Sequence, residues 1–333
     1  MKQKCVALLA CGLLYGGFIV CQTTAELQQT ANSFMRQADY ANAILVLNKA
    51  ALREPNNSSI QKDLALSYYY SQNNEKALEL IKPVLESTDA DDQCFLIAAN
   101  IYKQLAKPKE CVKTYKKGLK VFPQSGILYN GLGEIQSAMS NSDAIISWEK
   151  GIAVDPAYNK NYYNAAHYYQ LNKKLVWSIL YAEIFINMDP KSAITPETKQ
   201  LLLDNYKALF TEPDLTTLNK EKNKFADQFL ASMAAQASQS ALGINAETLS
   251  MIRTRFVISW FADKNNLSYK LFDYHKQLLK EGLFEAYNQW LFGAVENVQS
   301  YESWIKINAD EHKRYMKYQA STIFKMPLGQ YYH

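Results

Sequence analysis

An all-α protein is predicted, with a stack of similar helix pairs in its first half and a second helical domain after it. Glycine and proline are scarce, with 12 and 9 residues in a chain of 333, which favours long helices over a loop-rich β fold. Small, aromatic and proline residues also recur with a period of 34 residues through the first half. A single match of this kind occurs by chance, whereas five matches at near-constant spacing indicate a structural repeat.

Composition and charge narrow the classes of function. Hydrophobic residues make up 48% of the chain and charged residues 20%, as in ordinary folded proteins, and the length suffices for two cores. The net charge is +4 and no basic run is present. Because nucleic-acid binding needs a clustered positive field, we expect no nucleic-acid partner.

The first 21 residues have the layout of a signal peptide. Lys2 and Lys4 begin it, residues 5–21 carry no charge, and polar sequence starts at Gln22. A single membrane anchor is the alternative, but such a run, which also holds three glycines, is marginal for spanning a bilayer. We therefore expect export to the periplasm or outer cell envelope of a bacterium. Membrane association is expected only if Cys21 is lipidated.

The repeats are defined by residues at matching positions. The first and fifth copies align through these residues: Ala31, Phe34, Ala43 and Pro55 with Ala166, Tyr169, Ser178 and Pro190. Within a repeat region of residues 22–190, the units span 24–57, 58–91, 92–125, 126–158 and 159–192. The second unit has Asp89 where proline would fall, and the fourth is one residue short in the turn between its helices.

This pattern resembles the tetratricopeptide repeat, a helix–turn–helix unit of 34 residues. In such a unit, small residues let the first helix (helix A) and the second (helix B) approach closely, and the aromatic residue fills the space between neighbouring units. Proline ends helix B. The resemblance covers residues 24–190 and implies a curved solenoid of about five repeats, with the helices A lining its concave side.

The repeat register also locates the cysteines of the folded part. Cys94 lies early in a helix A and Cys111 early in the following helix B. Antiparallel packing separates their levels by about 7.5 Å along the helices, at 1.5 Å per residue. This separation is too large for an unstrained disulfide, so we predict two free thiols.

Ligand-facing positions of the family mark a candidate partner-binding surface. Its residues are Lys62, Tyr69, Tyr70, Asn100, Lys103, Asn130, Tyr163, Asn164 and His167. Amide and tyrosine side chains suit an extended peptide, although they also suit a sugar, and a solvated face without a ligand is a further alternative. The carboxylate clamp of chaperone-binding relatives is absent, because Gln28, Gln93 and Ile97 occupy its basic positions.

The second domain, residues 191–333, does not keep the 34-residue phase. Helix signals predict segments at 195–210, 215–241, 246–265, 267–280 and 283–292, followed by two more helices to residue 324. No HExxH, GxSxG, P-loop or CxxC motif is present. We therefore predict no catalytic residue, cofactor or metal site and a non-enzymatic protein. The aromatic residues of this domain are expected to form its core.

Helix B of the fifth repeat has an unusual outer face. Trp177, Leu180, Tyr181, Ile184 and Met188 occupy five of the six outer positions, whereas one of six is apolar in the third repeat. A terminal repeat exposed to solvent needs a polar outer face. We therefore predict an interdomain seam, with the C-terminal helical domain packed directly on the last repeat. Coverage of these residues by a partner protein is the alternative.

These observations predict an exported, non-enzymatic scaffold that binds a protein or peptide partner in its concave groove, with cell-envelope assembly as its setting. The alternative is a glycan- or peptidoglycan-binding module that uses aromatic side chains.

Overall fold

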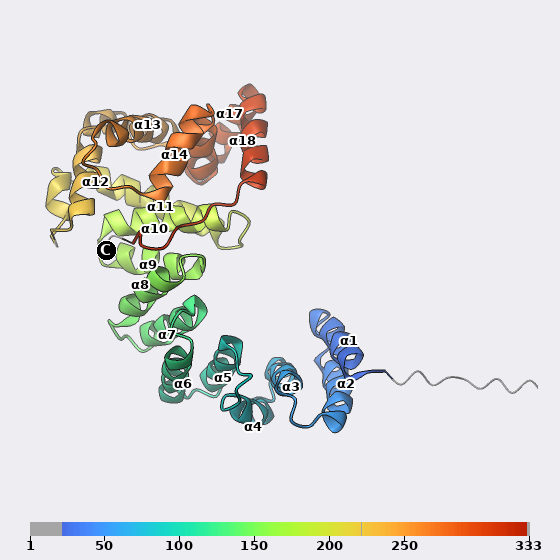
Figure 1. Cartoon of the computed structure of the whole chain (residues 1–333). Coiled ribbons are helices and arrows are strands. Elements are labelled where there is room, and N and C mark those ends of the chain that lie inside the picture. The colour runs from blue at the N-terminus through green and yellow to red at the C-terminus, as the bar shows by residue number, and fades with distance from the viewer. Residues whose placement is uncertain (1–21, 221, 332–333) are drawn as a thin grey trace, which may run out of the picture. The chain divides into compact units, whose positions relative to one another are not determined.

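The computed structural model describes residues 22–220 and 222–331, and Figure 1 shows the chain coloured from its N-terminus to its C-terminus. The predicted signal peptide, with Cys21, lies outside the described residues. Within them the chain is helical, without β-strands, and no helix is both long and apolar enough to cross a membrane. The described residues divide into two compact units, the first ending at Ala90 and the second beginning at Asp91.

The first unit contains two helix pairs. They are α1 (Thr24–Arg36) with α2 (Tyr40–Arg53), and α3 (Ser58–Tyr70) with α4 (Asn74–Val84). Thr23 begins α1 with a capping box, because its side chain accepts from the backbone of Glu26 while the Glu26 carboxylate accepts from the backbone of Thr23. The hydrophobic core of the first unit includes Leu27, Leu47 and Leu64.

The second unit continues the helix pairs. They are α5 (Asp92–Gln104) with α6 (Pro108–Val121), α7 (Gly126–Ala138) with α8 (Ala144–Val154), and α9 (Lys160–Leu171) with α10 (Leu175–Met188). Each helix packs on the next within this unit. The small residues act as predicted, since a Cβ at Gly131 would lie 2.4 Å from the ring of Tyr115 and one at Gly133 2.4 Å from Trp148.

The turn between helices A and B repeats one backbone feature. The fifteenth residue of every repeat lies in the left-handed region, with φ between 53° and 65°: Ala38, Gln72, Ala106, Ser140 and Lys173. In four repeats, helix B begins two residues later. In the fourth, where one residue is missing, α8 begins four residues after Ser140 and thus lacks part of its first turn. The left-handed residues thus recur at intervals of 34, 34, 34 and 33 residues.

Helix α11 (Thr195–Thr211) extends the repeat packing beyond the predicted array. It packs against both α10 and α9, which is the place of a sixth helix A. Asn205 of α11 donates to the hydroxyl of Ser178 in α10 at 2.7 Å, and both side chains are buried. The start of this helix agrees with the prediction, with Pro196 in its first turn.

The predicted single helix at 215–241 is wrong. The segment contains η1 (Leu215–Leu218), α12 (Lys224–Ala234) and η2 (Ala237–Leu242). Asn223 begins α12 as its cap by accepting from the backbone of Ala226 at 3.1 Å. Such local side-chain bonds compete with helix continuation, which the apolar pattern does not reveal. Gly243, at φ +85°, ends η2.

The remaining helices lie beyond α11, on the side of α10 and α11 that faces away from α9 (Figure 1). They are α13 (Ala246–Ala262), α14 (Lys270–Lys280), α15 (Phe284–Asn288), the π-helix η3 (Gln289–Gly293), α16 (Ala294–Glu296), α17 (Val298–Ile307) and α18 (Ala309–Ser321). The predicted helix at 283–292 therefore changes to π geometry at its C-terminal end. There Lys199 of α11 donates to the carbonyl of Trp290 at 2.7 Å and lies 3.5 Å from the centre of its ring.

After α18 the chain runs back across the domain as an extended tail (Figure 1). Phe324 and Met326 are buried in the core of the second unit. Gln330 accepts from the backbone N–H of Lys270 at 2.6 Å and donates to Ser268 at 3.2 Å. The tail is thus attached by both apolar and polar contacts.

The C-terminal domain packs directly on the last repeat, as the sequence predicts. Every residue from 175 to 186 in α10 is buried, and Met188 is partly buried against the same core. Trp177 stacks on Phe225 of α12 at 6.0 Å between ring centres, while Leu180, Tyr181 and Ile184 lie in the shared core. Burial of this face accounts for the missing polar surface.

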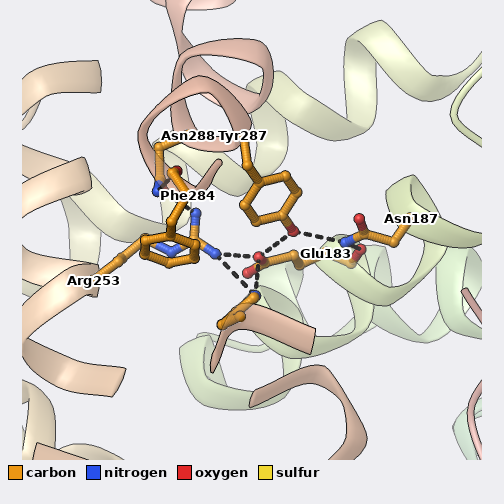
Figure 2. A network of polar contacts seen from close by, with 7 residues as sticks. Glu183, Asn187, Arg253, Phe284, Tyr287 and Asn288 are labelled. Atoms are coloured by element: carbon orange, nitrogen blue, oxygen red, sulfur yellow. Dashed lines mark hydrogen bonds and ion pairs between the residues drawn. The ribbon is translucent and has the colours of Figure 1, made fainter. Parts of the chain in front are cut away.

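A polar network lies inside this apolar seam (Figure 2). Glu183 of α10 is 1% exposed and pairs with Arg253 of α13, which is also 1% exposed. The same carboxylate oxygen lies 2.7 Å from His275 and accepts from the Tyr287 hydroxyl at 2.6 Å. In Figure 2 the Tyr287 hydroxyl lies between Glu183 and Asn187, whose amide donates to it at 2.7 Å.

Charge pairing keeps Glu183 ionised despite its burial. Burial alone would raise the pKa of Glu183, but the Arg253 guanidinium and then His275 hold it at about 2. Burial lowers the pKa of His275, and Glu183 opposes that shift. Arg253 also bonds to the side-chain oxygen of Asn288.

Removing one partner of this pair is expected to destabilise the second unit. Arg253→Leu leaves the Glu183 carboxylate buried without its main counter-charge, which should cost about 3–5 kcal/mol. Arg253→Leu combined with Glu183→Leu should be more stable than the single variant, because no buried charge is then orphaned. Urea unfolding followed by tryptophan fluorescence measures both. The control is Arg255→Leu, an exposed arginine of the same helix, and equal losses at the two arginines would contradict the account.

Glycine in the repeat turns should increase stability. Ala106→Gly removes the strain that a Cβ causes in a left-handed backbone conformation. The free energy of unfolding should rise by up to about 1 kcal/mol after the entropy cost of glycine. The matched control is Ala231→Gly, at an exposed position inside α12, which should lose about 1 kcal/mol. Thermal unfolding compares the two, and a loss at Ala106 as large as at Ala231 would be inconsistent with the strained turn.

Candidate functional site

Helices α5, α7, α9 and α11 of the second unit pack on one another in series. We call the face that they share the concave surface, because the repeat resemblance predicts this curvature. An amide ladder crosses two of these helices, because the side-chain N–H of Asn164 in α9 donates to the Asn130 oxygen at 2.8 Å. The Asn130 amide in turn donates to Glu134 at 2.8 Å. Asn130 is 4% exposed and Asn164 is half-buried. The ladder therefore fixes both amides at defined positions.

An aromatic group adjoins this ladder on α9. The Tyr163 hydroxyl donates to Glu197 of α11 at 2.5 Å. Its ring lies 4.5 Å from the ring of His167 and 5.3 Å from that of Phe185. These contacts hold Tyr163 and His167 in one orientation. Glu197 lies 34 residues after Tyr163, so the same repeat spacing links α9 to α11.

The electrostatics of this group are set by burial and by Glu197. Burial, with Glu197 adding to it, raises the pKa of Tyr163 to about 12. Burial lowers the pKa of His167, which Glu197 opposes. His167 is therefore mainly neutral at pH 7. Its Nε2 atom is buried and has no hydrogen-bond partner among the described residues.

The other predicted residues of this unit lie on α5. Asn100 is half-buried and accepts from the Tyr115 hydroxyl at 3.4 Å. Lys103 is exposed one turn further along α5. The structure thus places Asn100, Lys103, Asn130, Asn164 and the Tyr163–His167 pair on successive first helices of the repeats.

The predicted residues of the first unit form a separate cluster on α3. Tyr70 is 49% exposed and stacks on Tyr40 at 5.4 Å with an interplanar angle of 17°, while Tyr69 lies 5.2 Å from it. Lys62 is half-buried on the same helix. Nearby, Gln28 of α1 donates to Asp63 at 3.1 Å.

Glu197 is the residue of this surface that sequence reasoning missed. The prediction ended the repeats at residue 192 and therefore did not extend the ligand-facing positions to α11. The signal was present, because Glu197 follows Tyr163 by one repeat length and Asn164 follows Asn130 by the same interval.

Apart from His167, the described histidines and cysteines do not belong to this surface. His275 is buried in the Glu183 network, and His312 lies 3.5 Å from the Tyr301 hydroxyl. Cys94 and Cys111 are buried and form no disulfide, as predicted, and burial raises the pKa of Cys111 to about 11. The described residues contain no group of three or more histidine, cysteine or acidic side chains that could hold a metal ion.

One family model matches within the repeat region. The family described as anaphase-promoting complex, cyclosome, subunit 3 matches residues 36–118. Five helix pairs at the repeat spacing, each with a left-handed residue in its turn, decide the class. The first half of the chain thus has the architecture of a tetratricopeptide-repeat array. No curated protein sequence matches the chain.

Three solved structures illustrate the similarity. A thermophilic tetratricopeptide-repeat protein of Thermus thermophilus, TTC0263, has 15% identity and a TM-score of 0.44, over 56% of this chain and 99% of its own. MamA has 15% identity and a TM-score of 0.39, over 55% and 97%. YrrB, described as a tetratricopeptide-repeat protein with an unusual peptide-binding site, has 13% identity and a TM-score of 0.39, over 53% and 92%.

The charge of Glu197 is expected to control the titration of its neighbours in the array. Glu197→Gln should lower the pKa of Tyr163, which stays above its ordinary value because burial remains, and should also lower the pKa of His167. Both shifts have this sign because a negative charge favours the protonated form of either group. NMR titration with labelled tyrosine and histidine measures them, and Glu212→Gln, at an exposed position after the same helix, is the control. Unchanged pKa values would contradict the pairing.

Proposed function

We propose that this protein is a non-enzymatic scaffold that binds an extended segment of a partner protein on the concave surface of α5, α7, α9 and α11. The amide ladder of Asn130 and Asn164 is the observation that carries the proposal. Each amide has two N–H donors and an oxygen with two lone pairs. The ladder bonds use one N–H of each amide. Half-buried Asn164 therefore keeps bonding capacity for a partner, while Asn130, which is 4% exposed, fixes its orientation.

Fixed amides match the chemistry of a peptide backbone. Every backbone unit other than proline offers one donor and one acceptor, so an amide side chain can bind it whatever the neighbouring side chains are. Because Asn130 and Asn164 are already oriented by each other, little side-chain entropy is lost when a partner binds. The adjacent ring of Tyr163 offers an apolar edge for a side chain of the partner.

The distribution of charged residues along the surface supports a preferred direction of binding. Lys103 lies on α5, whereas Glu134 and Glu197 lie on α7 and α11. A partner segment with an acidic residue toward α5 and a basic residue toward α11 would complement this arrangement. Such complementarity contributes more to orientation and specificity than to affinity.

The cluster of Lys62, Tyr69 and Tyr70 on the first unit is proposed as a second contact for protein partners. Stacking of Tyr70 on Tyr40 fixes its ring while leaving about half of it exposed. Rigid tyrosines of this kind give contact area at low entropic cost.

Export to a bacterial cell envelope is part of the proposal and is supported by the sequence of the first 21 residues. An envelope setting would place the scaffold beside the proteins whose assembly it serves.

In-cell crosslinking tests the function. Asn164→Ala and Tyr163→Phe should each reduce the recovery of crosslinked partner proteins severalfold, because they remove a backbone-binding amide and the hydroxyl that orients the aromatic group. Lys113→Ala, at an exposed position of α6, is the control and should leave recovery unchanged. An identical partner set for all three variants would rule out this surface. Fractionation of the same cells should recover the protein in the envelope fraction, in a form from which residues 1–21 have been cleaved.

A further inference from the structure

A pocket lies between α8 and α9 and shares no residue with the concave surface. Its volume is about 380 Å³, at the small end of the range for ligand sites. Ile145, Ile146 and Ala153 of α8 and the ring of Tyr168 give it apolar walls. Lys150 contributes an exposed ammonium group. The pocket therefore combines apolar walls with positive charge at its edge.

The half-buried Glu149 side chain provides the acidic group of this pocket. It accepts from the Tyr169 hydroxyl at 2.8 Å and from the Tyr181 hydroxyl at 3.1 Å. Tyr331 of the tail also lines the pocket. The site thus joins the fourth and fifth repeats to a segment that lies far away in the sequence.

We infer that this pocket binds a compact apolar or aromatic group that carries a carboxylate. The apolar part would fill the space between the isoleucines and Tyr168, and the carboxylate would pair with Lys150 and Asn172. A free small acid and an aromatic residue beside an acidic residue of a partner protein share this chemistry. The pocket volume suits one such group.

The protonation of Glu149 should control this binding. Burial raises the pKa of Glu149 to about 7, while the bonds from Tyr169 and Tyr181 and the charge of Lys174 oppose the shift. The titratable or charged groups around the carboxyl group are Lys150 on α8, Tyr162 and Tyr169 on α9, Lys174 and Tyr181 at α10, and Tyr331 on the tail. The carboxylate of the ligand can bind beside Glu149 when the Glu149 carboxyl group is neutral, whereas ionised Glu149 repels it.

Titration of the full chain with 8-anilinonaphthalene-1-sulfonate, a compact aromatic anion, tests the pocket. Fluorescence should show one saturable site whose Kd is about tenfold weaker at pH 8 than at pH 6, because the neutral fraction of Glu149 falls by that factor. Glu149→Gln should bind at both pH values with the same Kd. Retention of the full pH dependence in this variant would overturn the role of Glu149.

Matched variants test the location. Ala153→Trp fills the pocket and should abolish saturable binding, whereas Ala157→Trp, at an exposed position of the following turn, should not. Lys150→Glu should weaken binding severalfold, and Lys116→Glu, an exposed lysine of α6, should leave it unchanged. Circular dichroism verifies that each variant is folded. Equal affinity in Ala153→Trp and Ala157→Trp would overturn the proposal.

Competition identifies the source of the ligand. Indole-3-acetate represents a free acid, and an acetylated peptide with tryptophan between two aspartates represents a partner protein. Displacement of the dye by either supports the pocket, and the tighter competitor identifies the source. Failure of both to displace it would overturn the inferred ligand class. Tyr163→Phe should not affect these titrations. The proposal for this pocket and the proposal for the concave surface can therefore be disproved independently.

Discussion

The buried carboxylate of Glu183 is the constraint on which the second unit depends. It lies on α10, which belongs to the fifth repeat by its register and to the C-terminal domain by its packing. An ionised group at this depth is tolerated only with charged and hydrogen-bonding partners. Those partners come from α13, α14 and α15 through Arg253, His275 and Tyr287. Three helices must therefore meet α10 in one arrangement.

The apolar and polar parts of this seam have different roles. Burial of the outer face of α10 supplies the favourable free energy of docking, because apolar contact is the dominant favourable term and is non-directional. A buried ion pair adds little net stability once its desolvation is counted. Its bonds have defined directions, however, so we infer that Glu183 and Arg253 select the orientation of the docked helices. Tyr287 extends this selection to α15.

The sequence revealed features that depend on spacing or on the total polarity of a face. The repeat period predicted the five helix pairs, and the apolar outer face of α10 predicted the seam. It did not reveal the partners of Glu183, because Arg253 and His275 lie 70 and 92 residues away and belong to helices whose packing has no repeat. The break at Asn223 was missed for a different reason, since a single side-chain cap interrupted an otherwise continuous helical pattern.

Helix α9 connects this constraint to the two proposed binding sites. Tyr163 and His167 lie on its concave side, while Tyr168 and Tyr169 face the pocket beside Glu149. Because α9 packs on α10, and α10 is joined to the C-terminal domain by the Glu183 network, we infer that α9 and this domain move as one body. The docked domain would thus keep the amides and the aromatic rings in place before a ligand arrives, which lowers the entropic cost of binding at both sites.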